Sequence, residues 1–282
     1  MNYIGVLWEK FLYQLGIWST ITSIIAIVSS TTEWGCYKWI LLVAAILLSI
    51  LISYCQVYCK RKKLSIAVNH RSNINISYGN IFEKEGVIVI PVNDYFDTHV
   101  GDGIIAPNTI HGKFIEKYFK NNTSELDAKI DAALSGTTGE NNLNRQPCGL
   151  KIKKYPLGTC ARIFHDNKIF ILVVSSCFNE NNHAVLNISE YPILIQQLYY
   201  HIEQYHENNP VYIPLIGSGM AGIDRTKMQL LNYMIAGAFY TDHLSISQGL
   251  NIILYPEDGN TLPDIHLNII KYQFKNYKYG NL

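Results

Sequence analysis

Two uncharged stretches near the start of the chain limit its architecture more than any other feature. Residues 11–30 carry no charged side chain over twenty positions, and residues 39–59 carry none over twenty-one. A helix rises about 1.5 Å per residue, so each stretch has the length that crosses the hydrocarbon core of a bilayer. The sequence therefore predicts an N-terminal hairpin of two transmembrane helices in residues 1–63, followed by a globular domain in residues 64–282.

Two alternatives to the hairpin stay open: a signal peptide followed by a core helix, and two buried helices of a soluble fold. A signal peptide has a basic start and a short apolar run, whereas Glu9 lies among the first ten residues here and the first run is longer. The second run is nearly unbroken Leu, Ile, Val and Ala. That composition favours a membrane span.

The charges around the second run predict the orientation of the hairpin. Lys60–Lys63 reads KRKK directly after it, whereas the connection between the two runs carries one acid and one base. Basic residues stay on the cytoplasmic side of a membrane. We therefore expect both the N-terminus and the globular domain to lie in the cytoplasm.

The globular part gives little support for a metal site or a nucleic-acid interface. The chain has six cysteines without a C-x-x-C pair, and none of its nine histidines belongs to an H-E-x-x-H motif. Residues 64–282 hold 17 basic and 20 acidic side chains, a net charge of 17 − 20 = −3. Duplex-binding domains carry a basic face instead. The cysteine usage is typical of a reducing compartment.

Short β-rich runs alternate with helical patterns through the globular part. Helical patterns follow Asn108, Thr123, Ser189 and Asp224. The predicted strands are Ile74–Phe82, Gly86–Asn93, Lys168–Cys177, Val211–Gly217 and Leu250–Pro256. This alternation predicts a three-layer α/β/α fold with a mixed, largely parallel sheet. Ligands of such folds bind beyond the carboxyl ends of the strands.

One of these strand ends carries a glycine motif. Gly217–Gly222 reads GSGMAG and matches G-x-G-x-x-G between a predicted strand and a predicted helix. A nicotinamide-binding fingerprint belongs in the first βαβ unit, with an acid at the end of the next strand. Here the motif comes late, and Asp242, the acid at the expected distance, follows a helix. A turn that holds phosphate through backbone N–H groups and the helix N-terminus fits better, and a glycine turn without a ligand stays open.

A second strand end has matching chemistry. After the strand Gly86–Asn93, Gly101 and Gly103 flank Asp102 shortly before a helix that Asn108 or Thr109 caps. Two glycine turns at one edge of a sheet are placed to hold two phosphates of one ligand from opposite sides. The pattern therefore favours a diphosphate that bridges two groups.

The order of four segments, YGNIF, VIVIPVN, GDGIIAPNTIHGKF and IPLIGSGMAGIDR, resembles that of the macro domain over most of residues 64–282. With the preceding hairpin, the chain is similar to Thoeris antiphage effectors that carry two transmembrane helices. The resemblance implies an ADP-ribose derivative as ligand, made from NAD by a TIR-domain partner, and no other cofactor. It also implies a multi-pass protein of the cell inner membrane with a cytoplasmic C-terminal domain, which forms homo-oligomers on activation and causes abortive infection.

The resemblance also assigns site residues. Asn93 would face the ribose, and Asn80 stands where many macro domains carry the Asp that reads adenine. The first phosphate loop would comprise Gly101, Asp102, Gly103, Ile104 and Ile105. The second would comprise Gly217, Ser218, Gly219, Met220, Ala221 and Gly222.

The resemblance, taken together with the sequence patterns, leaves three hypotheses about function. The first is a receptor without catalytic residues that binds an amino-acid-linked ADP-ribose and then associates to disrupt the membrane. The second is a membrane-tethered ADP-ribosyl hydrolase, in which Asn93, Asp94 or Asp102 places a water molecule. The third is a structural membrane anchor with a vestigial domain, which predicts no nucleotide binding.

Overall fold

The computed structural model describes residues 3–28, 37–58, 61–145, 150–219, 223–241, 244–256 and 265–275. These residues form two compact units. The first contains helices α1, α2 and α7, and the second contains the β-sheet with its flanking helices.

In the first unit the described residues of both apolar runs are helical. Helix α1 spans Tyr3–Val28 and helix α2 spans Tyr37–Tyr58. A short helix that the sequence patterns do not predict, α7 (Leu267–Gln273), joins this unit. The side-chain amide of Asn268 on α7 donates a 3.1 Å hydrogen bond to the carbonyl oxygen of Gln56 on α2.

Hydroxyl groups inside the apolar runs bond to their own helices. Thr20 donates to the carbonyl of Gly16 at 3.0 Å, and Ser53 donates to that of Ser49 at 2.7 Å. Over its described residues, neither helix has a stretch both long and apolar enough to cross a membrane. The two predicted membrane spans therefore stay a prediction.

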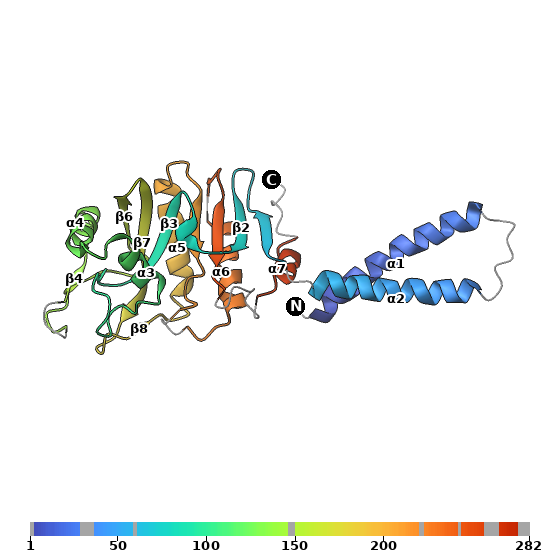
Figure 1. The fold of residues 1–282 in the computed structure, drawn as a ribbon, viewed down its shortest axis with the longest axis horizontal. Helices are drawn as coiled ribbons and strands as arrows, with labels where there is room; N and C mark the ends of the chain where they lie inside the picture. Colours follow the sequence, from blue (N-terminus) through green and yellow to red (C-terminus); the bar gives the residue numbers. More distant parts are fainter. Residues whose placement is uncertain are drawn as a thin grey trace. The chain divides into compact units, whose positions relative to one another are not determined.

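The second unit is built on one large mixed sheet with the strand order β1-β2-β10-β9-β3-β7-β6. The strands from β2 to β7 in this order are parallel, β1 and β6 are antiparallel at the edges, and β8 pairs with the end of β7 (Figure 1). The bounds are Lys63–Ala67 (β1), Asn73–Tyr78 (β2), Val87–Asn93 (β3), Cys160–His165 (β6), Lys168–Phe178 (β7), Ala184–Val185 (β8), Val211–Pro214 (β9) and Leu250–Leu254 (β10). The predicted mixed, largely parallel sheet is confirmed.

Helices cover both faces of this sheet. On one face, Ile88 and Ile90 of β3 pack in a cluster with Phe114 of α3 (Ile110–Tyr118) and Leu126 of α4 (Thr123–Ala133). The alternate residue Val89 is also fully buried and so faces the opposite side. Among the described residues, α5 (Tyr191–Tyr205) and α6 (Lys227–Phe239) add nothing to the first cluster and pack against each other. We assign them to the second face.

A separate two-stranded hairpin lies between α4 and β6. Strand β4 (Glu140–Asn141) pairs antiparallel with β5 (Lys153–Lys154). The sequence patterns predict only a polar loop over residues 141–149, and residues 146–149 lie outside the described part of the chain.

Candidate functional site

A cavity of about 960 Å³ opens at the carboxyl ends of three neighbouring strands, β9, β3 and β7. Parallel strands end at the same edge of a sheet, so the loops that follow them meet there. The cavity is lined by residues 91–93, 101–111, 175, 176, 178, 182–184 and 215–219.

This lining contains most of the site residues that the sequence predicts. Asn93, Gly101, Asp102, Gly103, Ile104, Ile105, Gly217, Ser218 and Gly219 all face the cavity. Met220, Ala221 and Gly222 lie outside the described residues. The described lining does not include Asn80.

The loop after β3 is shaped by three successive residues with positive φ. Gly101 has φ +108°, Asp102 φ +50° and Gly103 φ +76°. Glycine adopts this region without steric cost and Asp tolerates it better than most residues. The turn is closed by 2.9 Å hydrogen bonds from the N–H of Ile104 to the carbonyl of Gly101, and from the N–H of Gly101 to that of Ile105. The sequence G-D-G thus supplies the backbone freedom that this wall needs.

The turn after β9 forms the second wall. Gly217 has φ +81°, and the hydroxyl of Ser218 donates a 2.7 Å hydrogen bond to the carbonyl of Leu215. Among the described residues, no heavy atom outside the adjoining chain lies within 4 Å of a Cβ built on Gly219. That a helix N-terminus faces the ligand here stays a prediction. Helix α6 begins only at Lys227, and its cap Thr226 exchanges hydrogen bonds with Gln229.

A third wall comes from the end of β7 and the loop after it. Ser175 donates a 3.2 Å hydrogen bond to the carbonyl of Val92 on β3, and Ser176, Asn182 and His183 also line the cavity. The sequence patterns do not single out these residues as site residues. The signal that was available is the pair of serines at the end of an otherwise apolar strand.

Helix α3 presents a buried histidine to the cavity. His111 lies in its first turn, where Thr109 caps the helix by accepting a 3.0 Å hydrogen bond from Gly112. Burial, with a contribution from the charge of Lys151, lowers the pKa of His111 to about 3. The ring is therefore neutral near pH 7 and offers one donor and one acceptor. The sequence patterns did not single it out.

Both predicted asparagines are bonded within the protein. The side-chain oxygen of Asn93 accepts from the N–H groups of Tyr95 and Asp97 at 3.1 and 3.2 Å, and its amide donates to the Asp97 carboxylate at 3.0 Å. Asn80 caps a 3-10 turn by accepting from Phe82 at 3.1 Å. A role for Asn80 in reading adenine stays a prediction.

Asp94 and Asp102, the two carboxylates that a hydrolase could use to place water, lie in different surroundings. Asp94 is fully buried away from the described lining, where it accepts a 3.1 Å hydrogen bond from the N–H of Phe178 and pairs with Lys154 at 3.3 Å. Burial raises the pKa of Asp94. Asp102 is 84% exposed and contacts His99 at 2.8 Å. Only Asp102 is therefore placed to meet a molecule in the cavity.

The charge of the cavity is low. Asp102 is the only Asp, Glu, Lys or Arg among the described residues that line it. In the described part of the chain, no three His, Cys, Asp or Glu side chains gather as a metal site. A phosphate group bound here would depend on backbone N–H groups and neutral side chains rather than on a cation.

A mixed sheet with helices on both faces and a cavity at its carboxyl edge defines a macro-type α/β domain. Among solved structures, an Oceanobacillus iheyensis macrodomain mutant with ADPR matches with a TM-score of 0.52 at 14% identity, over 76% of this chain and 100% of that one. The same macrodomain with ADP also gives a TM-score of 0.52, at 13% identity over 76% of this chain and 97% of that one. These likenesses establish the fold.

A family model and a curated relative identify the family to which the chain belongs. The family described as "Thoeris protein ThsA, Macro domain" matches residues 74–255, and the chain therefore belongs to it. Thoeris protein ThsA of Bacillus amyloliquefaciens (strain Y2) is 38% identical over 152 residues, which are 53% of this chain and 50% of that protein. The chain thus spans about half the length of that curated relative.

Proposed function

We propose that this chain is an antiphage effector whose macro domain binds an ADP-ribose conjugate, such as an amino-acid-linked one, made by a TIR-domain partner. Binding then leads to association of several copies and disruption of the membrane. One observation carries the proposal: two glycine turns from neighbouring parallel strands flank a single cavity of about 960 Å³. Membership of the ThsA macro-domain family and the ADPR-bound relative support the choice of ligand.

The lining of the cavity suits such a ligand chemically. Its volume falls within the range of small-molecule sites. Ile104, Ile105, Leu215 and Ile216 supply apolar surface for a nucleoside. We expect backbone N–H groups of the two glycine turns to bind the pyrophosphate. A receptor rather than a hydrolase is favoured, because neither Asp94 nor Asp102 has the buried, oriented position in the cavity that a general base needs.

The membrane part of the proposal rests on the two apolar helices. Their uncharged runs of twenty and twenty-one residues and their self-bonded hydroxyl groups suit an apolar surrounding. We propose that they anchor the chain in the inner membrane with the macro domain in the cytoplasm. Flotation of the full-length chain with lipid vesicles tests this part, and a chain that stays at the bottom of the gradient after carbonate washing contradicts it.

Ligand binding is tested by calorimetry with ADP-ribose and its amino-acid conjugates on the wild type and on Gly219→Trp. A Cβ at this position meets no heavy atom of the described residues within 4 Å, so we expect the variant to fold while its side chain fills the ligand site. Gly136→Trp is the matched control because Gly136 is also open but lies away from the cavity. We expect loss of binding only in Gly219→Trp. Binding unchanged in that variant, or turnover of ADP-ribosylated protein by the wild type, contradicts the receptor.

A further inference from the structure

A buried ion pair lies next to residues that line the cavity. It takes no part in forming the two glycine turns. The carboxylate of Asp97 and the guanidinium of Arg145 are each only 2% exposed. Two parallel hydrogen bonds of 2.9 and 2.7 Å join them. Arg145 comes from the segment between β4 and β5, 48 residues further along the chain.

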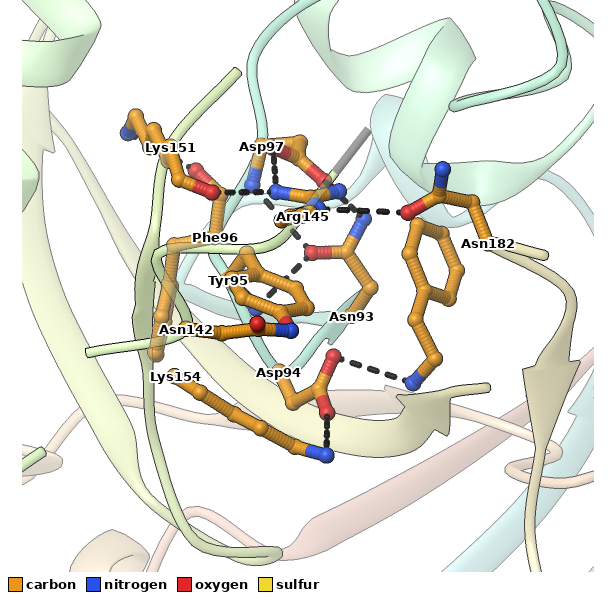
Figure 2. Close-up of polar contacts among 11 residues, drawn as sticks. Asn93, Asp94, Tyr95, Phe96, Asp97, Asn142, Arg145, Lys151, Lys154 and Asn182 are labelled. Carbon is orange, nitrogen blue, oxygen red and sulfur yellow. Dashed lines mark hydrogen bonds and ion pairs between the residues drawn. The ribbon is translucent and has the colours of Figure 1, made fainter. Parts of the chain in front are cut away.

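The same guanidinium is linked to two walls of the cavity, to one directly and to the other through Asp97. Its Nε donates a 3.2 Å hydrogen bond to the side-chain oxygen of Asn182 in the loop after β7. On the other side, Asp97 accepts a 3.0 Å hydrogen bond from the amide of Asn93 at the end of β3. Asn93 and Asn182 both line the cavity. Figure 2 shows Arg145 between Asp97 and Asn182, with Asn93 reaching the same carboxylate.

Further contacts fix the guanidinium itself. It donates a 2.5 Å hydrogen bond to the carbonyl of Lys151, and its central carbon lies 3.6 Å from the centre of the Tyr95 ring. Four of its five N–H donors are thus used. Arginine is suited to this position because its planar fork holds several acceptors at fixed angles, which a lysine ammonium does not.

A buried ion pair is a poor device for stability, since removing two charges from water costs about as much as their attraction returns. What a bidentate pair supplies is geometry. We propose that Arg145 is a positioning residue for the ligand: it sets the orientation of Asn93 through Asp97 and of Asn182 directly, and so fixes the spacing of the β3 and β7 walls. The ligand concerned is a nucleoside diphosphate sugar, and in that respect the inference rests on the proposed function.

The neighbouring pair Asp94–Lys154 provides a matched control. Like Asp97 and Arg145, these two residues join the loop after β3 to the β4–β5 hairpin. Asp94 lies between Asn93 and Asp97 in the chain, and its carboxylate is 3.3 Å from the ammonium group of Lys154. Neither residue is among those that line the cavity. The variant Lys154→Gln therefore weakens the attachment of the β4–β5 hairpin but leaves the hydrogen bonds of Asn93 and Asn182 in place.

The experiment compares full-length wild type, Arg145→Lys and Lys154→Gln by calorimetry with ADP-ribose and by thermal unfolding. Arg145→Lys keeps the charge but not the fork, so we expect binding about tenfold weaker, the loss associated with one charge-assisted hydrogen bond. Lys154→Gln should bind as the wild type does. Equal affinity in all three chains, or an equal loss in both variants, overturns the inference.

A spectroscopic measurement separates positioning from a general loss of stability. In chains labelled with 15N-asparagine and free of ligand, Arg145→Lys should shift the side-chain amide signals of Asn93 and Asn182, whereas Lys154→Gln should not. If Arg145→Lys does not fold, Asn182→Gly replaces it, because glycine tolerates the φ of +55° found at this position and leaves the ion pair intact. Wild-type affinity in Asn182→Gly overturns the inference. A wild type that binds no ADP-ribose but shows the expected amide shifts refutes the proposed function alone.

Discussion

At the scale of single residues, two glycines of one turn have different roles. A Cβ on Gly217 would lie 2.5 Å from the Cδ1 of Ile223, and its φ of +81° disfavours any side chain. A Cβ on Gly219 meets no atom within 4 Å in the part of the chain that the structure describes. We predict that Gly217→Ala lowers the free energy of unfolding by about 1–3 kcal/mol, whereas Gly219→Ala changes it by no more than about 0.5 kcal/mol. Urea denaturation measures the free energy of unfolding of both variants. Equal losses in the two contradict the different roles assigned to Gly217 and Gly219.

His111 makes the stability of the domain depend on pH. Its pKa is lowered from 6.5 to about 3 chiefly by burial, so the unfolded chain binds the proton more readily than the folded one. The contribution of His111 is therefore fully present above pH 6.5 and is lost as the pH falls toward about 3. Between pH 6.5 and 5, where ordinary carboxylates are still ionised, we expect a loss of up to about 2 kcal/mol.

His111→Gln should remove most of that loss, as measured by urea denaturation at stepped pH values. Burial also lowers the pKa of His201, so we expect part of the acid sensitivity to persist in this variant. His183→Gln serves as the control because His183 is exposed. If His183→Gln flattens the pH profile as much as His111→Gln does, the buried imidazole is not its origin.

At the scale of elements, the five strands that the sequence predicts are the five parallel strands of the sheet. Buried parallel strands such as β3 and β7 read as nearly continuous apolar runs, which are easy to recognise. The edge strands β1 and β6 are half exposed and the paired residues of the β4–β5 hairpin are charged or polar, so they carry no such signal. The loops after β3 and β9 were predictable because their glycines are visible in sequence. Arg145 was not, because its partner is 48 residues away.

Helix α3 shows how close packing places an element at the cavity. A Cβ on Gly112 would lie 2.4 Å from the carbonyl oxygen of Ala106 and 2.9 Å from the Cα of Pro107, two backbone atoms of the lining loop. Gly112→Ala must therefore push the helix away from the loop. We expect a loss of about 1–3 kcal/mol in unfolding free energy together with weaker binding of ADP-ribose.

Gly237 on α6 is the control for this prediction. Its added Cβ would meet the Cγ2 of Ile195 at 2.8 Å, a side-chain methyl that can move, rather than backbone. Alanine also favours the interior of a helix over glycine. Gly237→Ala should cost less than Gly112→Ala in the same denaturation experiment and leave binding of ADP-ribose unchanged. A larger loss at Gly237 contradicts the argument.

At the scale of the whole molecule, the proposed function requires that occupancy of the cavity change the association of complete chains. A ligand shifts such an equilibrium only through a difference in its affinity for the two states. Moving a population from 1:99 to 99:1 takes a difference of about 10⁴-fold. Because this coupling is reciprocal, association must strengthen ligand binding by the same factor.

This reciprocity gives a prediction that does not depend on how the membrane is damaged. We expect the apparent Kd for the ADP-ribose conjugate to fall as full-length chains are reconstituted at increasing density in lipid vesicles, and equilibrium binding of labelled ligand measures it. Gly219→Trp controls for ligand adsorbed to lipid, since its cavity is predicted to be blocked. An apparent Kd that is the same at every density means that the ligand binds associated and separate chains equally, and such a ligand cannot be the signal for assembly.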